Sequence, residues 1–311
     1  MKEMQSNNIP EYLRKITSLR DISACKAYIK VFTDFLFDLM KELRDKKLSH
    51  SSERMSEADI WVQMIFTNAL AISRLLDGIS YERKGVSLNP FIDHRMVFAL
   101  TRTLYENLIA FELVYILPLD DDKKTFMYYL YAAAGYKEQL ECLSGSRDKY
   151  PEHIASIEES LTDAEQKAKS TEYYKNADID NKRVIDNALK SGRYRYRINE
   201  KGVLEKAEWE NAMKMIGINR EVLDGLYKYF SNLSHPSHWG QLQFHQSFES
   251  QKPEYINLVC FATSCVILFL SIFVKDFEKL VPETCEVLSG QAYDNRQMIM
   301  LYEHRFRGAR R

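Results

Sequence analysis

Apolar residues recur at spacings of three and four along most of this chain, which predicts α-helices rather than strands. The pattern indicates helices over these stretches: Glu11 to Lys47, Ser56 to Gly78, Phe91 to Leu117, Lys123 to Leu143 and Pro151 to Ser170. Residues 81–89 are expected to be a loop, with Asn89 as helix cap and Pro90 as the first helical residue. Residues 171–190 are polar and could be helical, but their Asp, Asn and Lys content favours a mobile connection.

The most hydrophobic stretch lies at residues 255–275. No charged residue occurs from Leu258 to Val274, but this run is short for a bilayer span, and Thr263, Ser264 and Ser271 interrupt it. A helix buried on all sides of a bundle explains such a segment. A single-pass membrane anchor stays open as the alternative, and the protein would then be a membrane-anchored sensor.

Together these elements predict an all-α fold, a multi-helix bundle around this very apolar C-terminal helix, with one short extended hairpin near residues 193–203. We expect a single helical domain over residues 1–311. It would comprise an N-terminal helical extension over 1–50, a core bundle over 56–275, and C-terminal helices with a basic tail over 276–311.

The composition excludes several classes of protein. Hydrophobic residues make up 45% and charged residues 28%, which is typical of globular chains. With 43 Lys plus Arg against 44 Asp plus Glu, the net charge of -1 gives no overall attraction to nucleic acid. The 5 cysteines are scattered without a C-x-x-C pair, and the N-terminus lacks an apolar signal segment. We therefore expect reduced thiols and a cytoplasmic location.

A stripe of polar residues is the first candidate site. Tyr227, Ser231 and His235 recur every fourth residue, so a helix places them on one side. Pro236 disfavours a helical conformation at His235, which should therefore stand where the helix ends. The negative end of the helix dipole would favour the protonated imidazole at that place.

An arginine and a glutamate form the second candidate. Arg102 and Glu106 are an i, i+4 pair on a helix that is otherwise apolar on several sides, so partial burial is expected. Such a pair either fixes the register of the helix or holds the arginine toward a pocket. Both interpretations stay open at this point.

Other motifs give weaker indications. His235, His238 and His245 straddle a proline and match zinc-site spacing loosely, and Asp120 to Asp122 lack the Gly and Glu positions of an EF-hand. We expect no metal and no cofactor. A further segment alternates Arg193, Arg195 and Arg197 with tyrosines. This pattern suits nucleic-acid binding, but solvated arginines on an edge strand give the same pattern.

Two of these segments together carry a family resemblance. They are the R-x-x-x-E pair of Arg102 and Glu106, and a tryptophan-led segment from Trp209 that ends in Y-x-x-x-S-x-x-x-H-P-S at Tyr227, Ser231 and His235. The chain resembles a bacterial family of all-α proteins known only as a domain of unknown function, over residues 60–274.

That family in turn is similar to the HEPN class of helical bundles. Many HEPN proteins are metal-independent ribonucleases in toxin or antiphage systems, and such bundles often pair as homodimers. HEPN nucleases carry arginine and histidine on one helix as R-x(4–6)-H. No arginine lies just before His235, so Arg102 would have to come from another helix.

Two functions therefore remain open. One is a non-catalytic module that binds a nucleotide, an RNA or a protein partner in a defence or regulatory system, with the polar set as its pocket. The other is RNA cleavage or another phosphoryl transfer, in which His235 acts as base, Arg102 stabilises charge, Ser231 or Tyr227 orients phosphate and Glu106 holds Arg102. A cleft open beside His235 would favour cleavage, and a sealed network would favour the non-catalytic module.

Overall fold

The structure is a computed structural model of the chain, and it describes residues 21–45, 53–218, 225–249 and 253–307. These residues form helices almost throughout, with two short two-stranded sheets, so the predicted all-α fold is confirmed. We expected a single domain over 1–311, whereas the chain forms two compact units. Unit 1 comprises residues 1–108 and 217–311, and unit 2 is the continuous segment 109–216. Each unit is described by itself below.

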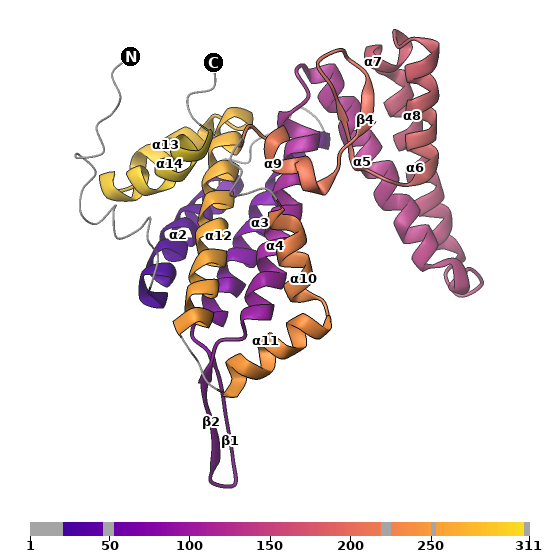
Figure 1. Cartoon of the computed structure of the whole chain (residues 1–311). Coiled ribbons are helices and arrows are strands. Elements are labelled where there is room, and N and C mark those ends of the chain that lie inside the picture. Colours follow the sequence, from indigo (N-terminus) through magenta and orange to yellow (C-terminus); the bar gives the residue numbers. More distant parts are fainter. Residues whose placement is uncertain (1–20, 46–52, 219–224, 250–252, 308–311) are drawn as a thin grey trace. The chain divides into compact units, whose positions relative to one another are not determined.

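Unit 1 is a bundle of long helices with a β-hairpin (Figure 1). Its elements are α2 (Ile22–Asp45), α3 (Glu53–Leu75), β1 (Ile79–Arg83), β2 (Val86–Phe91), α4 (His94–Phe111, in this unit to residue 108), α10 (Leu226–Ser234), α11 (His238–Glu249), α12 (Pro253–Leu280), α13 (Glu283–Gly290) and α14 (Tyr293–Arg307). Helix α12 packs against α2, α13 and α14. Its side chains from Cys265 to Val274 are buried, which is why the stretch has almost no polar residues.

Helix α12 is the one described helix that is long and apolar enough to cross a membrane. Of its most apolar window, 72% is buried within the protein, as in the core helix of a soluble bundle. The single-membrane-anchor alternative thus finds only weak support in this helix.

The loop predicted for residues 81–89 was wrong, because β1 and β2 form an antiparallel hairpin there. Tyr81 pairs with Leu88 and Arg83 with Val86, across a turn in which Lys84 and Gly85 both have positive φ. Such a two-residue turn matches the twist of paired strands. Pro90 lies in β2 rather than at the start of a helix, and α4 begins only at His94.

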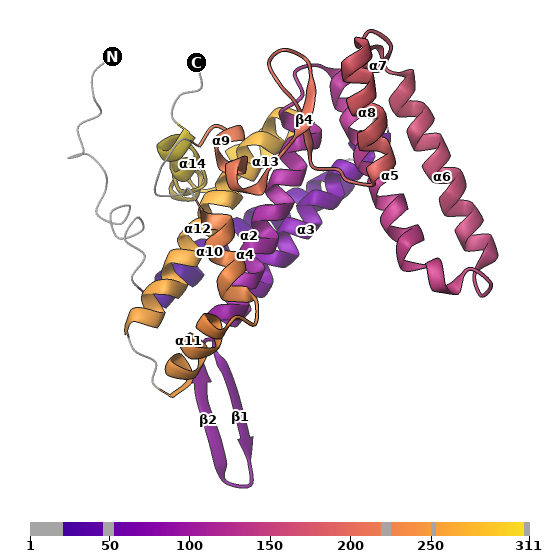
Figure 2. The same cartoon turned by 45° about the vertical axis from the view of Figure 1, so that its right-hand side comes forward.

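Unit 2 is built on two long antiparallel helices (Figure 2). Its elements are η2 (Glu112–Ile116), α5 (Asp121–Cys142), η3 (Ser144–Ser146), α6 (Pro151–Ser170), α7 (Glu172–Lys175), α8 (Ile179–Ser191), β3 (Tyr196–Ile198), β4 (Leu204–Lys206), η4 (Trp209–Asn211) and α9 (Ala212–Met215). The antiparallel pair β3–β4 is the short hairpin expected near 193–203.

Residues 171–190 form α7 and α8, so the helical alternative for this segment is confirmed and the favoured mobile connection was wrong. Helix α8 buries Ile185, Ala188 and Leu189 in the core shared with α5 and α6. Its Asn181 is 6% exposed and is fully engaged. The Nδ2 group donates to Gly202 O at 3.2 Å, and Oδ1 accepts from Leu204 N at 3.0 Å. The polar composition thus reflects bonds inside the unit rather than mobility.

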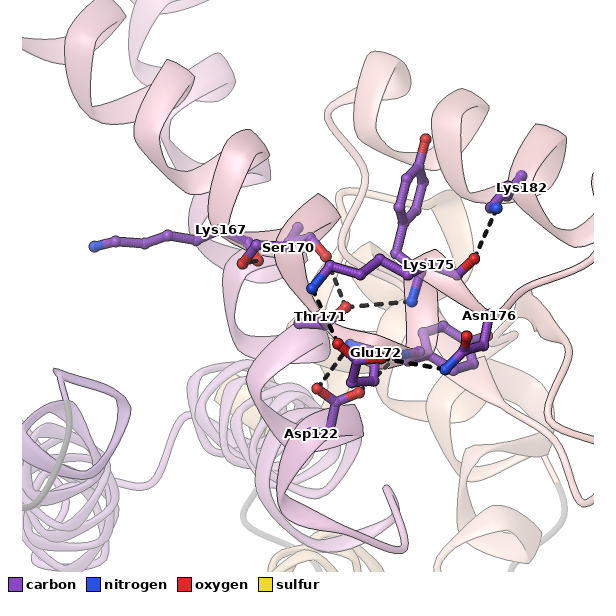
Figure 3. Close-up of polar contacts among 11 residues, drawn as sticks. Asp122, Lys167, Ser170, Thr171, Glu172, Lys175, Asn176 and Lys182 are labelled. Atoms are coloured by element: carbon purple, nitrogen blue, oxygen red, sulfur yellow. Dashed lines mark hydrogen bonds and ion pairs between the residues drawn. The ribbon is translucent and has the colours of Figure 1, made fainter.

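Asp122 ties α7 to α5, as Figure 3 shows. One carboxylate oxygen accepts from Glu172 N at 3.0 Å and the other from Tyr173 N at 2.7 Å. Two otherwise unpaired amides at the start of a helix are satisfied in this way. Asp120 caps α5 by accepting from Lys123 N at 2.8 Å, so these aspartates act as helix caps.

Candidate functional site

Helix α10 is placed by its aromatic side. Phe230 and Leu233 are fully buried, and Phe230 packs on Phe98 of α4 with ring centroids 5.7 Å apart and on Phe261 of α12 at 6.5 Å. Tyr229 packs edge-on against Phe98 at 5.6 Å. This packing orients α10 so that Tyr227 and Ser231 face Arg102 on α4.

Arg102 stands at the centre of the five residues singled out from the sequence. Its Nε donates to Glu106 Oε1 at 2.9 Å, and its Nη2 donates to the hydroxyl of Tyr227 at 2.9 Å. Its Nη1 lies 2.9 Å from His235 Nε2 and 3.4 Å from Ser231 Oγ. The guanidinium also lies over the Tyr227 ring, 5.0 Å from its centroid. All five residues, from two helices of unit 1, therefore meet around one guanidinium.

The set is open to solvent. The side chain of Arg102 is 22% exposed and that of Glu106 is 31% exposed, and His235 is an exposed residue. Behind them, Tyr105 is buried and packs on Tyr227 with ring centroids 5.9 Å apart and on Phe269 at 5.5 Å. The polar groups thus have an apolar floor and an exposed rim, which differs from a sealed structural network.

Helix α10 ends where Pro236 predicts, just before His235. The helix ends at Ser234, and His235 has an extended backbone conformation while its N–H donates to Ser231 O at 3.0 Å. A guanidinium only donates hydrogen bonds, so the contact of Arg102 with His235 is a hydrogen bond when Nε2 of His235 accepts and the ring proton is on Nδ1.

The corner between α10 and α11 was not anticipated from the sequence. Ser237 Oγ accepts from Gly240 N at 3.0 Å and donates to Asn232 O at 3.1 Å, so it caps α11 and holds it to the end of α10. A Cβ on Gly240 would lie 3.2 Å from Ser237 Oγ and 3.3 Å from His235 O. The S-x-x-G spacing is the one signal that could have indicated this tight corner.

The three arginines predicted to bind nucleic acid belong to unit 2 and are not part of this set. Arg197 pairs with Glu205 across the β3–β4 hairpin, with 2.7 Å between Nε and Oε1. Arg195 lies over the ring of Trp209 at 5.6 Å. Arg193 is exposed.

The histidines of the H-P-S-H segment do not assemble a metal centre. Within the residues that the structure describes, no group of three or more His, Cys, Asp or Glu side chains is arranged to hold a metal ion. His245 instead lies 3.4 Å from Glu249 on the exposed side of α11.

Comparison of the chain with known protein families, with curated proteins and with solved structures gives no match.

Proposed function

We propose that the Arg102 site of unit 1 recognises a phosphate group, and that the protein is a binding or regulatory module. The observation that carries this proposal is the partly exposed guanidinium whose terminal nitrogens contact Tyr227, Ser231 and His235. A planar guanidinium can donate two parallel hydrogen bonds to phosphate oxygens. Glu106 on Nε fixes the orientation of that plane.

The chemistry of the surrounding groups also suits an anion. Two hydroxyls and one imidazole surround the arginine, and each of these groups can either donate or accept. Without a ligand they accept hydrogen bonds from the terminal nitrogens of Arg102. When a phosphate takes the guanidinium donors, the same three groups can turn and donate to the phosphate. The site is therefore satisfied in both states.

We propose the biological setting from the resemblance described above alone: a bacterial cytoplasmic protein of a defence-type system, with an RNA, a nucleotide or a protein as partner and a homodimer as its assembly. The contacts of Arg102 support a phosphate as the group that such a partner would present to the site.

Binding of inorganic phosphate, measured by calorimetry on the full chain, tests the proposal. Arg102→Gln should abolish binding, because it removes the charge and the fork of donors. Arg74→Gln is the matched control, since it removes the same charge from an exposed position on α3 of unit 1. Equal affinity in the wild type and in Arg102→Gln would refute the proposal.

One observation favours a second candidate, metal-independent RNA cleavage. His235 is exposed rather than sealed in a network, which is the condition stated above as favouring cleavage, and its Nε2 would act as base after exchanging Arg102 for the hydroxyl. A neutral imidazole beside a guanidinium can take the proton of a ribose 2′-hydroxyl while the arginine stabilises the charge that develops on phosphorus. Incubation of single-stranded RNA with the protein and a chelator tests this candidate. Cleavage by the wild type but not by His235→Ala, with unchanged melting temperature, would support it, and no cleavage by the wild type would exclude it.

A further inference from the structure

Trp239 is the exposed aromatic residue closest in the chain to the Arg102 site. It lies in the first turn of α11, four positions after His235, and is 46% exposed. Burying a tryptophan is strongly favourable, so an indole that is half exposed four positions after His235 invites a functional explanation. The question is what kind of group would cover it.

The backbone at Trp239 is held near His235 by the corner between α10 and α11, the two helices that follow one another in Figures 1 and 2. Trp239 directly precedes Gly240, whose lack of a side chain lets α11 approach His235 O. Ser237 joins the two helices through Asn232 O and Gly240 N, and Ser237 N donates to His235 O at 2.7 Å. The indole is thus held on a short, fully bonded turn directly after the histidine.

We infer that the phosphate recognised at Arg102 belongs to a nucleotide, and that Trp239 is the platform on which its base stacks. This inference rests on the proposed function of the Arg102 site. In a nucleotide the base and the phosphate are separated by one sugar. Trp239 follows His235 by four positions across the corner between α10 and α11, so one small ligand could contact both. Stacking on an exposed aromatic ring is the usual means by which proteins hold unpaired bases of any sequence.

The charges of the site agree with a small ligand of this class. The site has one guanidinium balanced by Glu106, and the exposed α11 surface that follows has histidines and glutamines rather than lysines or arginines. Long tracts of nucleic acid are gripped by rows of cations. A single nucleotide or a chain end instead needs one phosphate contact and one stacking contact.

Leu242 provides a matched comparison. It lies one turn further along α11 and is also 46% exposed, but its side chain has no π-surface. If the exposed apolar residues of α11 served to bind a protein, truncating either residue would have a similar effect. If Trp239 stacks on a base, only its truncation affects nucleotide binding.

The test compares inorganic phosphate, ribose 5-phosphate and AMP as ligands of the full-length protein, by calorimetry. We expect AMP to bind on the order of ten-fold more tightly than ribose 5-phosphate. Trp239→Ala should remove this preference without changing the affinity for inorganic phosphate. Trp239→Phe should retain part of the preference, and Leu242→Ala all of it.

The outcomes separate this inference from the proposal beneath it. Equal binding of AMP and ribose 5-phosphate by the wild type, or a preference that survives Trp239→Ala, overturns the stacking role while phosphate recognition stands. A preference that is lost equally in Trp239→Ala and Leu242→Ala also overturns it. If none of the three ligands binds, the phosphate-recognition proposal fails and the stacking role fails with it.

Discussion

Arg102 donates to Nε2 of His235 across 2.9 Å, although 133 positions separate the two residues in the chain. Because a guanidinium offers only donors, this contact selects one tautomer of the imidazole, with its proton on Nδ1. That proton then points away from the arginine, while Nε2 is occupied by the arginine N–H.

The tautomer can be measured directly. Long-range nitrogen–proton NMR spectra of the imidazole rings should show His235 protonated on Nδ1 and not on Nε2 in the ligand-free protein. In Arg102→Met, where no donor faces Nε2, the Nε2-protonated form should appear. His153, exposed on α6, should give the same signals in both proteins. A wild-type His235 protonated on Nε2 would contradict the hydrogen bond.

The corner glycine should tolerate substitution poorly. Gly240→Ala places a methyl group 3.3 Å from His235 O, and we expect a net loss of about 1 kcal/mol of unfolding free energy from this overpacking. Gly135→Ala in α5 is the opposite case, because nothing lies within 4 Å of its Cβ position. There the better helix propensity of alanine should stabilise the protein by about 1 kcal/mol. Urea unfolding should give a lower unfolding free energy than the wild type for Gly240→Ala and a higher one for Gly135→Ala.

The stability of unit 1 should fall on the acid side because of His94. This side chain is 0% exposed, and burial lowers its pKa below the ordinary value of 6.5. The unfolded chain therefore takes up the proton first as the pH falls through 6.5, and stability is lost until the lower pKa of the folded state is passed. Above 6.5 both states are neutral and this contribution is constant.

His94→Phe should flatten that acid-side decline, since phenylalanine can keep the ring packing of His94 on Tyr255 and Phe98. The measurement is urea unfolding from about pH 8 to about pH 5. His245→Gln, on the exposed side of α11, should keep the wild-type decline because His94 is intact. If the unfolding free energy of His94→Phe declines at acid pH as steeply as that of the wild type, groups other than His94 cause the decline.

Asn181 should be among the most sensitive polar residues of unit 2. Its replacement by alanine leaves Leu204 N–H and Gly202 O without their partners, and we expect a loss of about 1–3 kcal/mol. Asn176→Ala removes the same amide from an exposed position whose Nδ2 lies 3.3 Å from Glu172 Oε2. That control should change the unfolding free energy by less than about 0.5 kcal/mol.

The cysteines should divide sharply in reactivity. Cys142 and Cys285 are exposed, whereas Cys265 is buried and burial raises its pKa to about 12. A thiol reagent should label the two exposed residues in the native protein and all 5 cysteines in denaturant. The hydrogen bond to Glu278 raises the pKa of Cys285, so Glu278→Ala should accelerate labelling there. Fast native labelling of Cys265 would contradict its burial.

Much of the fold could be predicted because helical periodicity is local information. The fourfold spacing of Tyr227, Ser231 and His235 and the pair Arg102–Glu106 could each be identified within one helix. That the two sets meet depends on Phe230 packing against Phe98, a contact between distant segments that periodicity does not encode.

The errors have physical causes as well. The hairpin at 79–91 was missed because its turn uses Lys84, a residue that rarely adopts positive φ, and because Pro90 suggested a helix start. A mobile connection was favoured over helix α8 because a buried asparagine looks like a loop residue until its three partners are known.

The insertion of unit 2 into unit 1 has a consequence for synthesis on the ribosome. Unit 2 is one continuous segment, residues 109–216, so it can fold once that segment has emerged. The first segment of unit 1 must meanwhile wait for α10 and α12. At about 5–20 residues per second, the 133 positions between Arg102 and His235 correspond to a delay on the order of 10 s. During that interval the nascent chain exposes the apolar sides of α2, α3 and α4, which makes it a natural client for chaperones.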